Sequence, residues 1–219
     1  MHIRYFTIAG GNQTALIEDC DPSSRLDLAR SLLATVEQVG FTESGDIPTL
    51  IMMGGELCIN ALLAFASIQT LETGTIRIDT QLVTYSKTKN AATIIIPLPY
   101  TRIDTTILFD TIGYLITDNT EPIAKTFFQE QAIQHHLPAF GVIQRQPDSS
   151  IAPHVYVRDT NSLITETSCG SGSVAFSIVT GITPVIQPTQ QTIAIHEHTV
   201  GMYTISAEVF EYYPSVLVY

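Results

Sequence analysis

Apolar positions along this chain follow two spacings, one typical of strands and one typical of a helix. Residues 3–8 and 14–18 carry the β-branched and aromatic side chains of strands. The segment Gly10-Gly11-Asn12-Gln13 between them predicts a turn. Asp21-Pro22-Ser23-Ser24 then supplies capping residues for a helix whose apolar positions recur every three or four residues. These positions are Leu26, Ala29, Leu32, Leu33, Val36 and Val39.

Each half of the chain shows strands, a helix, a strand, and then a helix that begins at a cysteine and precedes more strands. Pro97-Leu98-Pro99 lies between the halves, so we expect domains at residues 1–99 and 100–204. A tandem duplication explains this order, and chance is the alternative because α/β alternation is common. In the first half we expect a cysteine-headed helix at 58–70 and strands at 48–53, 75–78, 82–85 and 92–96. In the second half we expect strands at 106–109, 113–117, 139–144, 154–157, 192–195 and 203–210, a helix from 119 to 132 and a helix that begins at residue 169.

The composition indicates a globular protein with an acidic surface. The 219 residues are 45% hydrophobic, enough for two small domains or one large one. Ten Lys and Arg against 21 Asp and Glu give a formal charge of −11, which argues against nucleic acid or an anionic membrane as partner. The first residues lack an apolar signal region, and the longest apolar stretch, 58–68, is too short to span a membrane. Three cysteines without close spacing do not form a secreted disulfide framework, so we expect a soluble, cytoplasmic protein.

Two of the cysteines, Cys58 and Cys169, stand at the start of the two cysteine-headed helices. A thiol there lies against unpaired backbone N–H groups and the positive end of the helix dipole, and both favour the thiolate. A small residue follows each cysteine at the third position, Ala61 and Gly172. The alternative is that each cysteine is a small core residue. A matched pair favours chemistry that requires two equivalent groups.

Four segments carry a resemblance to a known family. Cys58-Ile59-Asn60-Ala61 is similar to a Cys-Gly-Asn-Gly motif, and Glu166-Thr167-Ser168-Cys169-Gly170-Ser171-Gly172 to an acidic residue shortly before Cys-Gly-Thr/Ser-Gly. Gly11-Asn12 and the run from Val36 to Phe41 are similar as well. The chain thereby resembles the diaminopimelate epimerase-like family of cofactor-independent amino-acid racemases and epimerases. The resemblance implies an α+β fold of two pseudo-symmetric domains, each a barrel-like sheet around a central helix, with the active site in the cleft between them. It also implies that the last strand, about 205–219, can return to the first domain.

The same resemblance implies an isomerase that inverts the α-carbon of an amino acid without cofactor or metal. Cys58 and Cys169 then face each other across the substrate, where one thiolate removes the α-proton and the other thiol returns a proton to the opposite face. Hydrogen bonds that strengthen as charge moves onto the substrate carboxylate stabilise the carbanion. Two roles stay open for Glu56 and Glu166, contact with the substrate amine or stabilisation of the loops. The remaining substrate-binding residues that the resemblance implies are Asn12, Ile59, Asn60, Gly170 and Ser171.

Two departures from the family bear on the substrate. Ile59 stands where the family has Gly, and Asp159-Thr160-Asn161-Ser162 lacks the Glu-Arg pair that holds the distal end of diaminopimelate. The wording around the cysteines looks closer to the histidine racemase branch, so histidine is the substrate we expect. Alternatives are diaminopimelate epimerisation, an isomerase or dehydratase with one cysteine, and a non-catalytic amino-acid-binding protein. The oligomeric state is open, with a homodimer as one option.

Two further features have simpler interpretations. Cys20 follows a predicted strand, where an incidental cysteine is the simpler explanation. His196 and His198 alternate with Glu197, a spacing compatible with a metal, although no third ligand is identifiable.

Overall fold

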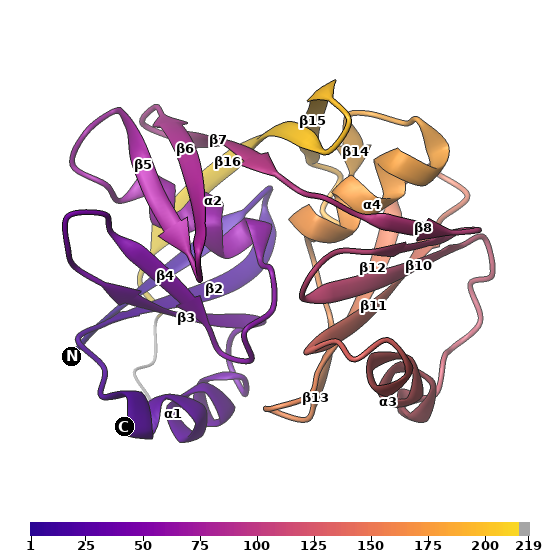
Figure 1. Cartoon of the computed structure of the whole chain (residues 1–219), viewed down its shortest axis with the longest axis horizontal. Coiled ribbons are helices and arrows are strands. Elements are labelled where there is room, and N and C mark those ends of the chain that lie inside the picture. Colours follow the sequence, from indigo (N-terminus) through magenta and orange to yellow (C-terminus); the bar gives the residue numbers. More distant parts are fainter. Residues whose placement is uncertain (215–219) are drawn as a thin grey trace.

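A computed structural model describes residues 1–214 as two packed β structures lying side by side (Figure 1). The first is a closed barrel, because its strands pair in sequence and the last strand pairs again with the first. Around the barrel the order is β1-β2-β3-β4-β5-β6-β7-β16. Their bounds are β1 His2–Ile8, β2 Gly11–Glu18, β3 Gln38–Glu43, β4 Thr49–Met52, β5 Thr73–Ile78, β6 Gln81–Lys87, β7 Ala91–Pro97 and β16 Met202–Tyr212.

Helix α2 (Ile59–Ser67) fills the barrel. Residues from Ile59 to Ala66 are all buried, as expected for a helix that is apolar on every side. The strands supply the surrounding core by alternation: on β7, Ala92, Ile94 and Ile96 point inward. Small residues on α2 allow the strands to approach closely on all sides.

Strand β16 closes the barrel although it comes from the end of the chain. It pairs with β7 on one side, where Ile205 lies opposite Ile94, and with β1 on the other, where Tyr212 lies opposite Tyr5. The domain limits at 99 and 204 stay a prediction. Residues 215–219 of the expected last strand lie outside the described residues.

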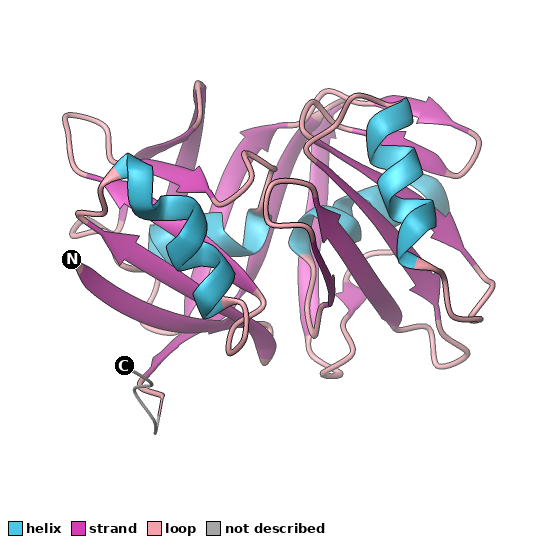
Figure 2. Ribbon diagram, turned by 90° about the horizontal axis from the view of Figure 1, so that it is seen from below, coloured by secondary structure: helices cyan, strands magenta, loops and turns pink. Residues whose placement is uncertain are grey.

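The second structure is a six-stranded sheet with a helix on each face. Helix α4 (Gly170–Thr180) packs on β10 and β11, and α3 (Lys125–Gln134) packs on β11 and β12. Figure 2 shows α3, together with α1 (Arg25–Leu32), outside the strands on the near side. The sheet runs β13-β12-β11-β10-β9-β8, with β8 Thr101–Ile103, β9 Thr106–Leu108, β10 Ile112–Thr117, β11 Ala139–Arg145, β12 Ile151–Val157 and β13 Ser162–Thr165.

The expected mixed fold with a barrel-like sheet around a helix is confirmed for the first half. In the described residues, pairing does not close the second sheet into a barrel, because β14 (Val185–Ile186) and β15 (Thr192–Thr199) join β16 instead. One bridge between Ser150 and Ile186 connects β14 to the start of β12. Helix α4 is therefore enclosed by strands that belong to both sheets.

Three expected helices have different limits in the structure. The first ends at Leu32, and Val39 belongs to β3, where it lies opposite Ala15 of the parallel strand β2. The helical spacing of apolar residues thus runs past a real helix end into β-branched residues that pair with a strand. The cysteine-headed helix of the first half ends at Ser67, and α3 begins at Lys125 after an extended segment.

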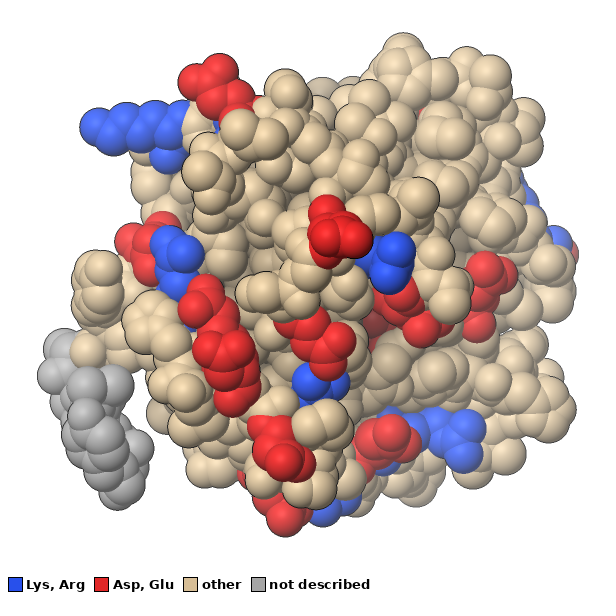
Figure 3. All heavy atoms as spheres, turned by 60° about the vertical axis from the view of Figure 1, so that its left-hand side comes forward, with Lys and Arg blue, Asp and Glu red and all other residues tan. Residues whose placement is uncertain are grey.

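Acidic side chains are spread over the face of the molecule shown in Figure 3, with basic side chains between them, in line with the formal charge of −11. Among the described residues, no helix is long and apolar enough to cross a membrane.

Candidate active site

The two cysteines occupy equivalent places in the two halves. Cys58 is the N-cap of α2 and Cys169 is the N-cap of α4, both with extended backbone. The Sγ of Cys58 accepts a hydrogen bond from the Ala61 N–H at 3.3 Å, and the Sγ of Cys169 accepts one from the Gly172 N–H at the same distance. Each thiol thus takes the capping role that Ser or Asp usually has.

The starts of α2 and α4 abut each other. A methyl group added at Gly170 would lie 2.6 Å from the Ile59 Cβ, so only glycine fits here without a shift. Two asparagine side chains reinforce the contact, because the Nδ2 atoms of Asn12 and Asn60 both donate to the Ser168 carbonyl at 2.8 Å. The backbone N–H of Asn12 also donates to the Thr167 side chain at 2.6 Å.

Asn12 and Asn60 therefore place the residue that precedes Cys169. The structure brings both asparagines, Ile59, Gly170 and Cys169 together at the junction of the halves, as the sequence analysis expects of one site.

A small cavity lies at this junction, between the two halves. Its volume is about 10 Å³, room for one water molecule. Side chains from β3 and the segment before α2 form one wall, and side chains from β10, β12, β13 and the start of α4 form the other. Its polar residues are Glu37, Gln38, Glu56, Cys58, Tyr114, Glu166 and Ser171, and its apolar residues are Met53, Leu57, Ile112, Val155, Val157 and Ile164.

Gln38 connects the two halves of this site. The Cys58 thiol donates to the Gln38 Oε1, and the Gln38 Nε2 donates to the Glu166 Oε1 at 2.6 Å. The other carboxyl oxygen of Glu166, Oε2, is buried without a hydrogen-bond partner among the described residues. Such an orphaned acceptor lining a cavity fits a ligand that donates hydrogen bonds.

Tyr114 holds the second cysteine from below. Its hydroxyl lies 2.8 Å from the Ser171 Oγ and 3.6 Å from the Cys169 Sγ. The ring fits because Gly141 on the neighbouring strand has no side chain, and a methyl group there would lie 2.4 Å from the ring. Tyr114 and the role of Gln38 escape sequence reasoning. Gln38 lies in the segment that resembles the family, whereas no sequence signal marks Tyr114.

Burial dominates the electrostatics of the site. Removal from water raises the pKa of Cys58 and of Cys169 well above the usual value, and the neighbouring Glu166 carboxyl raises both further. The helix-start N–H groups act in the opposite direction, but they do not outweigh burial. The expected thiolate-favouring environment is therefore wrong for the closed cavity. Each thiol needs a nearby group that can take its proton.

Two carboxyl groups beside the thiols are shifted in the same direction. Burial raises the pKa of Glu166 to about 8 and that of Glu56 to about 7. Both groups thus exchange protons near neutral pH, the range in which an acid–base partner for a thiol is useful.

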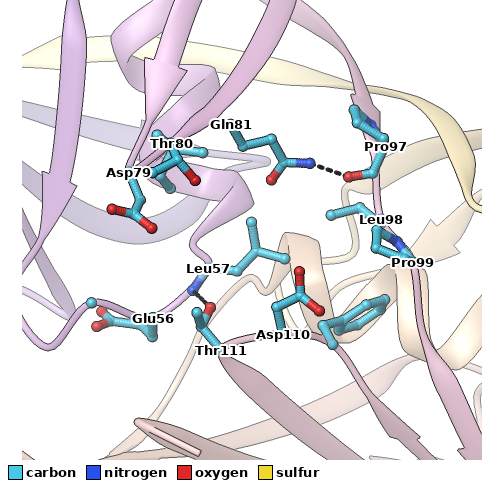
Figure 4. Close-up of a pocket in the computed structure, with 13 residues that line it drawn as sticks. Glu56, Leu57, Asp79, Thr80, Gln81, Pro97, Leu98, Pro99, Asp110 and Thr111 are labelled. Atoms are coloured by element: carbon cyan, nitrogen blue, oxygen red, sulfur yellow. Dashed lines mark hydrogen bonds between the residues drawn. The ribbon is translucent and has the colours of Figure 1, made fainter.

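A second, larger cavity of about 320 Å³ lies on the other side of the segment that precedes Cys58 (Figure 4). Asp79 and Asp110 line it from opposite sides, and the Leu57 N–H donates to the Thr111 Oγ1 at 2.8 Å beside it. Neither Cys58 nor Cys169 lines this cavity.

The remaining expected features lie elsewhere. Cys20 is half-buried and free, and its Sγ contacts the Asp21 carbonyl. His196 and His198 stack edge to face with ring centroids 4.7 Å apart. In residues 1–214, no group of three His, Cys, Asp or Glu side chains could hold a metal ion.

Comparison with known proteins agrees with this geometry. The chain is 26% identical over 213 positions to a histidine racemase from Staphylococcus aureus (strain Mu50), covering 77% of this chain and 76% of that protein. The resemblance seen in the sequence is confirmed. No family model matches the chain.

Solved structures show the same fold at low identity. A predicted epimerase from Pseudomonas aeruginosa matches with a TM-score of 0.67 at 10% identity, covering 100% of both chains. A hydroxyproline epimerase from Agrobacterium vitis, solved with trans-4-hydroxy-L-proline, matches with a TM-score of 0.58 at 11% identity, covering 96% of this chain and 88% of that chain. All three relatives carry the names of isomerases.

Proposed function

We propose that this protein is a cofactor-independent amino-acid racemase in which Cys58 and Cys169 act as the two bases. The observation that carries the proposal is the pair of thiols at equivalent N-cap positions of two helices whose starts abut. The names of the relatives support an isomerase. A reaction that depends on two thiols is also best served by the reducing conditions of the cytoplasm.

The reaction exchanges one proton for another. One thiolate takes the α-proton, so that the Cα–H bond breaks and an S–H bond forms. The opposite thiol then gives its proton to the other face of the carbanion, and its sulfur keeps the electron pair as a thiolate. The roles of Cys58 and Cys169 exchange for the opposite enantiomer, and no oxidation or reduction takes place.

The carbanion is stabilised from the two helix starts. Helix geometry leaves the first N–H groups of α2 and α4 without partners inside the helix, and the helix dipoles add positive potential there. A substrate carboxylate placed between them receives hydrogen bonds that strengthen as it gains charge. The residues that contribute these N–H groups are Ile59, Asn60, Gly170 and Ser171.

Glu166 is the residue we assign to the substrate amine. Its Oε2 is buried and unpartnered and its carboxyl lines the cavity, so it can accept a hydrogen bond from an ammonium group. Histidine is the substrate we propose, since the sequence relative is named a histidine racemase. The apolar residues of the cavity can pack against an imidazole ring, and Glu56 offers a carboxyl group to its N–H.

The decisive experiment is α-deuterium incorporation in D₂O, measured for all L-amino acids under reducing conditions. We expect histidine to gain one deuterium while losing optical purity. Cys58→Ser and Cys169→Ser should each lower the rate at least about 100-fold, because either variant lacks one of the two bases. Cys20→Ser, which removes a thiol outside the cavity, is the control and keeps the wild-type rate.

The other outcomes separate the alternatives. Turnover of diaminopimelate would make the chain an epimerase of that substrate. Full activity in either cavity cysteine variant would refute the two-thiol mechanism and favour an enzyme with one essential cysteine. Binding without deuterium uptake would identify a non-catalytic amino-acid-binding protein.

A further inference from the structure

A continuous line of buried side chains joins the two thiols. It runs from Cys58 to the Gln38 amide, from the amide to the Glu166 carboxyl, and from Glu166 to the neighbouring Cys169. All four side chains are at least nine-tenths buried. Gln38 is the one member of this line that cannot ionise, so its contribution has to come from the direction of its hydrogen bonds.

The amide of Gln38 has an acceptor end and a donor end. In the structure the acceptor, Oε1, takes the thiol proton of Cys58, and the donor, Nε2, points at the Glu166 carboxyl. This arrangement suits a Cys58 thiol with the negative charge on the side of Glu166 and Cys169. A half-turn of the amide suits the opposite state, since Nε2 then donates to a Cys58 thiolate and Oε1 accepts from a protonated Glu166.

We propose that Gln38 is a positioning residue that allows a single negative charge to lie on either side of the site. The inference rests on the two-thiol reaction proposed above. A two-base racemase alternates between two charge states, because each turnover leaves the thiolate on the opposite cysteine. Rotation of one amide gives each state a matched set of hydrogen bonds without adding a charge to the buried site.

The surrounding ionisable groups fit a site with one charge. Glu37 and Glu56 lie near Glu166, and Tyr114 lies beside Cys169. The Glu37 carboxyl is already occupied, since it accepts from the Thr167 N–H at 2.8 Å and the Thr167 hydroxyl at 2.5 Å. A further buried anion next to Glu166 would be repelled, so a neutral amide is the group that suits the place of Gln38.

Two variants test this role. Gln38→Met keeps the length of the side chain and removes both hydrogen bonds. Gln38→Glu keeps the size and an acceptor but lacks the N–H that a Cys58 thiolate needs. The control is Gln144→Met, which removes another buried amide, one that donates to the Glu121 carbonyl at 2.8 Å and does not line the cavity.

The first readout is iodoacetamide labelling of each cysteine between pH 6 and 9, measured by peptide mass spectrometry with Cys20 as the internal reference. In both Gln38 variants we expect Cys58 to label about tenfold more slowly, because its thiolate loses a hydrogen bond. The pH at which Cys58 reacts should rise by about one unit. A merely structural loss would open the cavity and speed the labelling of Cys58, which would overturn the proposal.

The second readout is the pH profile of kcat/KM for the amino acid that shows α-exchange. We expect a fall of about tenfold in both Gln38 variants and none in Gln144→Met. Wild-type kcat/KM and wild-type labelling in both variants would overturn the role of Gln38 and leave the two-thiol reaction intact. If the wild type exchanges no amino acid, the proposed function fails, and the labelling still decides whether Gln38 sets the ionisation of Cys58.

Discussion

At the scale of single residues, burial controls the chemistry of the site more than sequence position does. Cys58 and Cys169 cap their helices, yet removal from water raises the pKa of both thiols. The residue types and their helical positions are legible in the sequence. The balance between helix-start N–H groups and desolvation is not, because it depends on how completely the other half of the chain covers each thiol.

The shifted carboxyl groups predict a stability that depends on pH. Burial raises the pKa of Glu166 to about 8 from an ordinary value of 4.5, so the folded state holds this proton where the unfolded state has lost it. Stability contributed by the protonated group is present at low pH and lost as pH rises from about 4.5 to 8, by up to about 1.4 kcal/mol per pH unit. Urea unfolding of the wild type at pH 5, 6.5 and 8 should show this fall.

Glu166→Gln removes the titration and should flatten the profile. Glu208→Gln, at an outward-facing carboxyl on β16, is the matched control and should keep the wild-type slope. An unchanged slope in Glu166→Gln would show that Glu166 does not carry the linkage.

At the scale of elements, pairs of strands decide which side chains reach the site. Tyr114 on β10 lies opposite Gly141 on β11, and the missing side chain there gives the Tyr114 ring its place beneath Ser171 and Cys169. The strands themselves follow from the hydrophobic pattern. Their register does not, and register is what sets Tyr114 beside Gly141.

Gly141→Ala should destabilise the protein by about 2–3 kcal/mol, since the added methyl group overlaps the Tyr114 ring. The effect should be much smaller in a Tyr114→Ala background, where the ring is absent, and a double-mutant cycle in urea measures the coupling. Gly45→Ala is the control, because a methyl group there meets only the Ile47 carbonyl at 3.8 Å. Additive effects in the cycle would contradict the contact.

At the scale of the whole molecule, the first barrel depends on the end of the chain. Strand β16 supplies pairing to both β7 and β1, and Arg4 on β1 holds Glu211 on β16 through two hydrogen bonds of 2.8 and 2.7 Å. The helix with Cys58 therefore lies in a core that residues 1–99 do not complete.

Truncation after residue 201 should unfold the first barrel, because it removes β16 and leaves β1 and β7 as open edges around α2. Circular dichroism and amide hydrogen exchange on α2 would measure the loss. Truncation after residue 214, which keeps β16 whole, is the control. A protected α2 in the shorter chain would show that the barrel closes without β16.

The sequence by itself determined the mixed α/β pattern, the two cysteine-headed helices and the resemblance to amino-acid racemases, because each depends on local spacing or a short motif. It misplaced the end of α1, since helical spacing continued by chance into residues that pair as β3. Only the tertiary structure decided that the two helix starts meet at Gly170, that Gln38 lies between Cys58 and Glu166, and that β16 closes the barrel. These are contacts between residues far apart in the chain, and they are set by packing and strand register rather than by any local pattern.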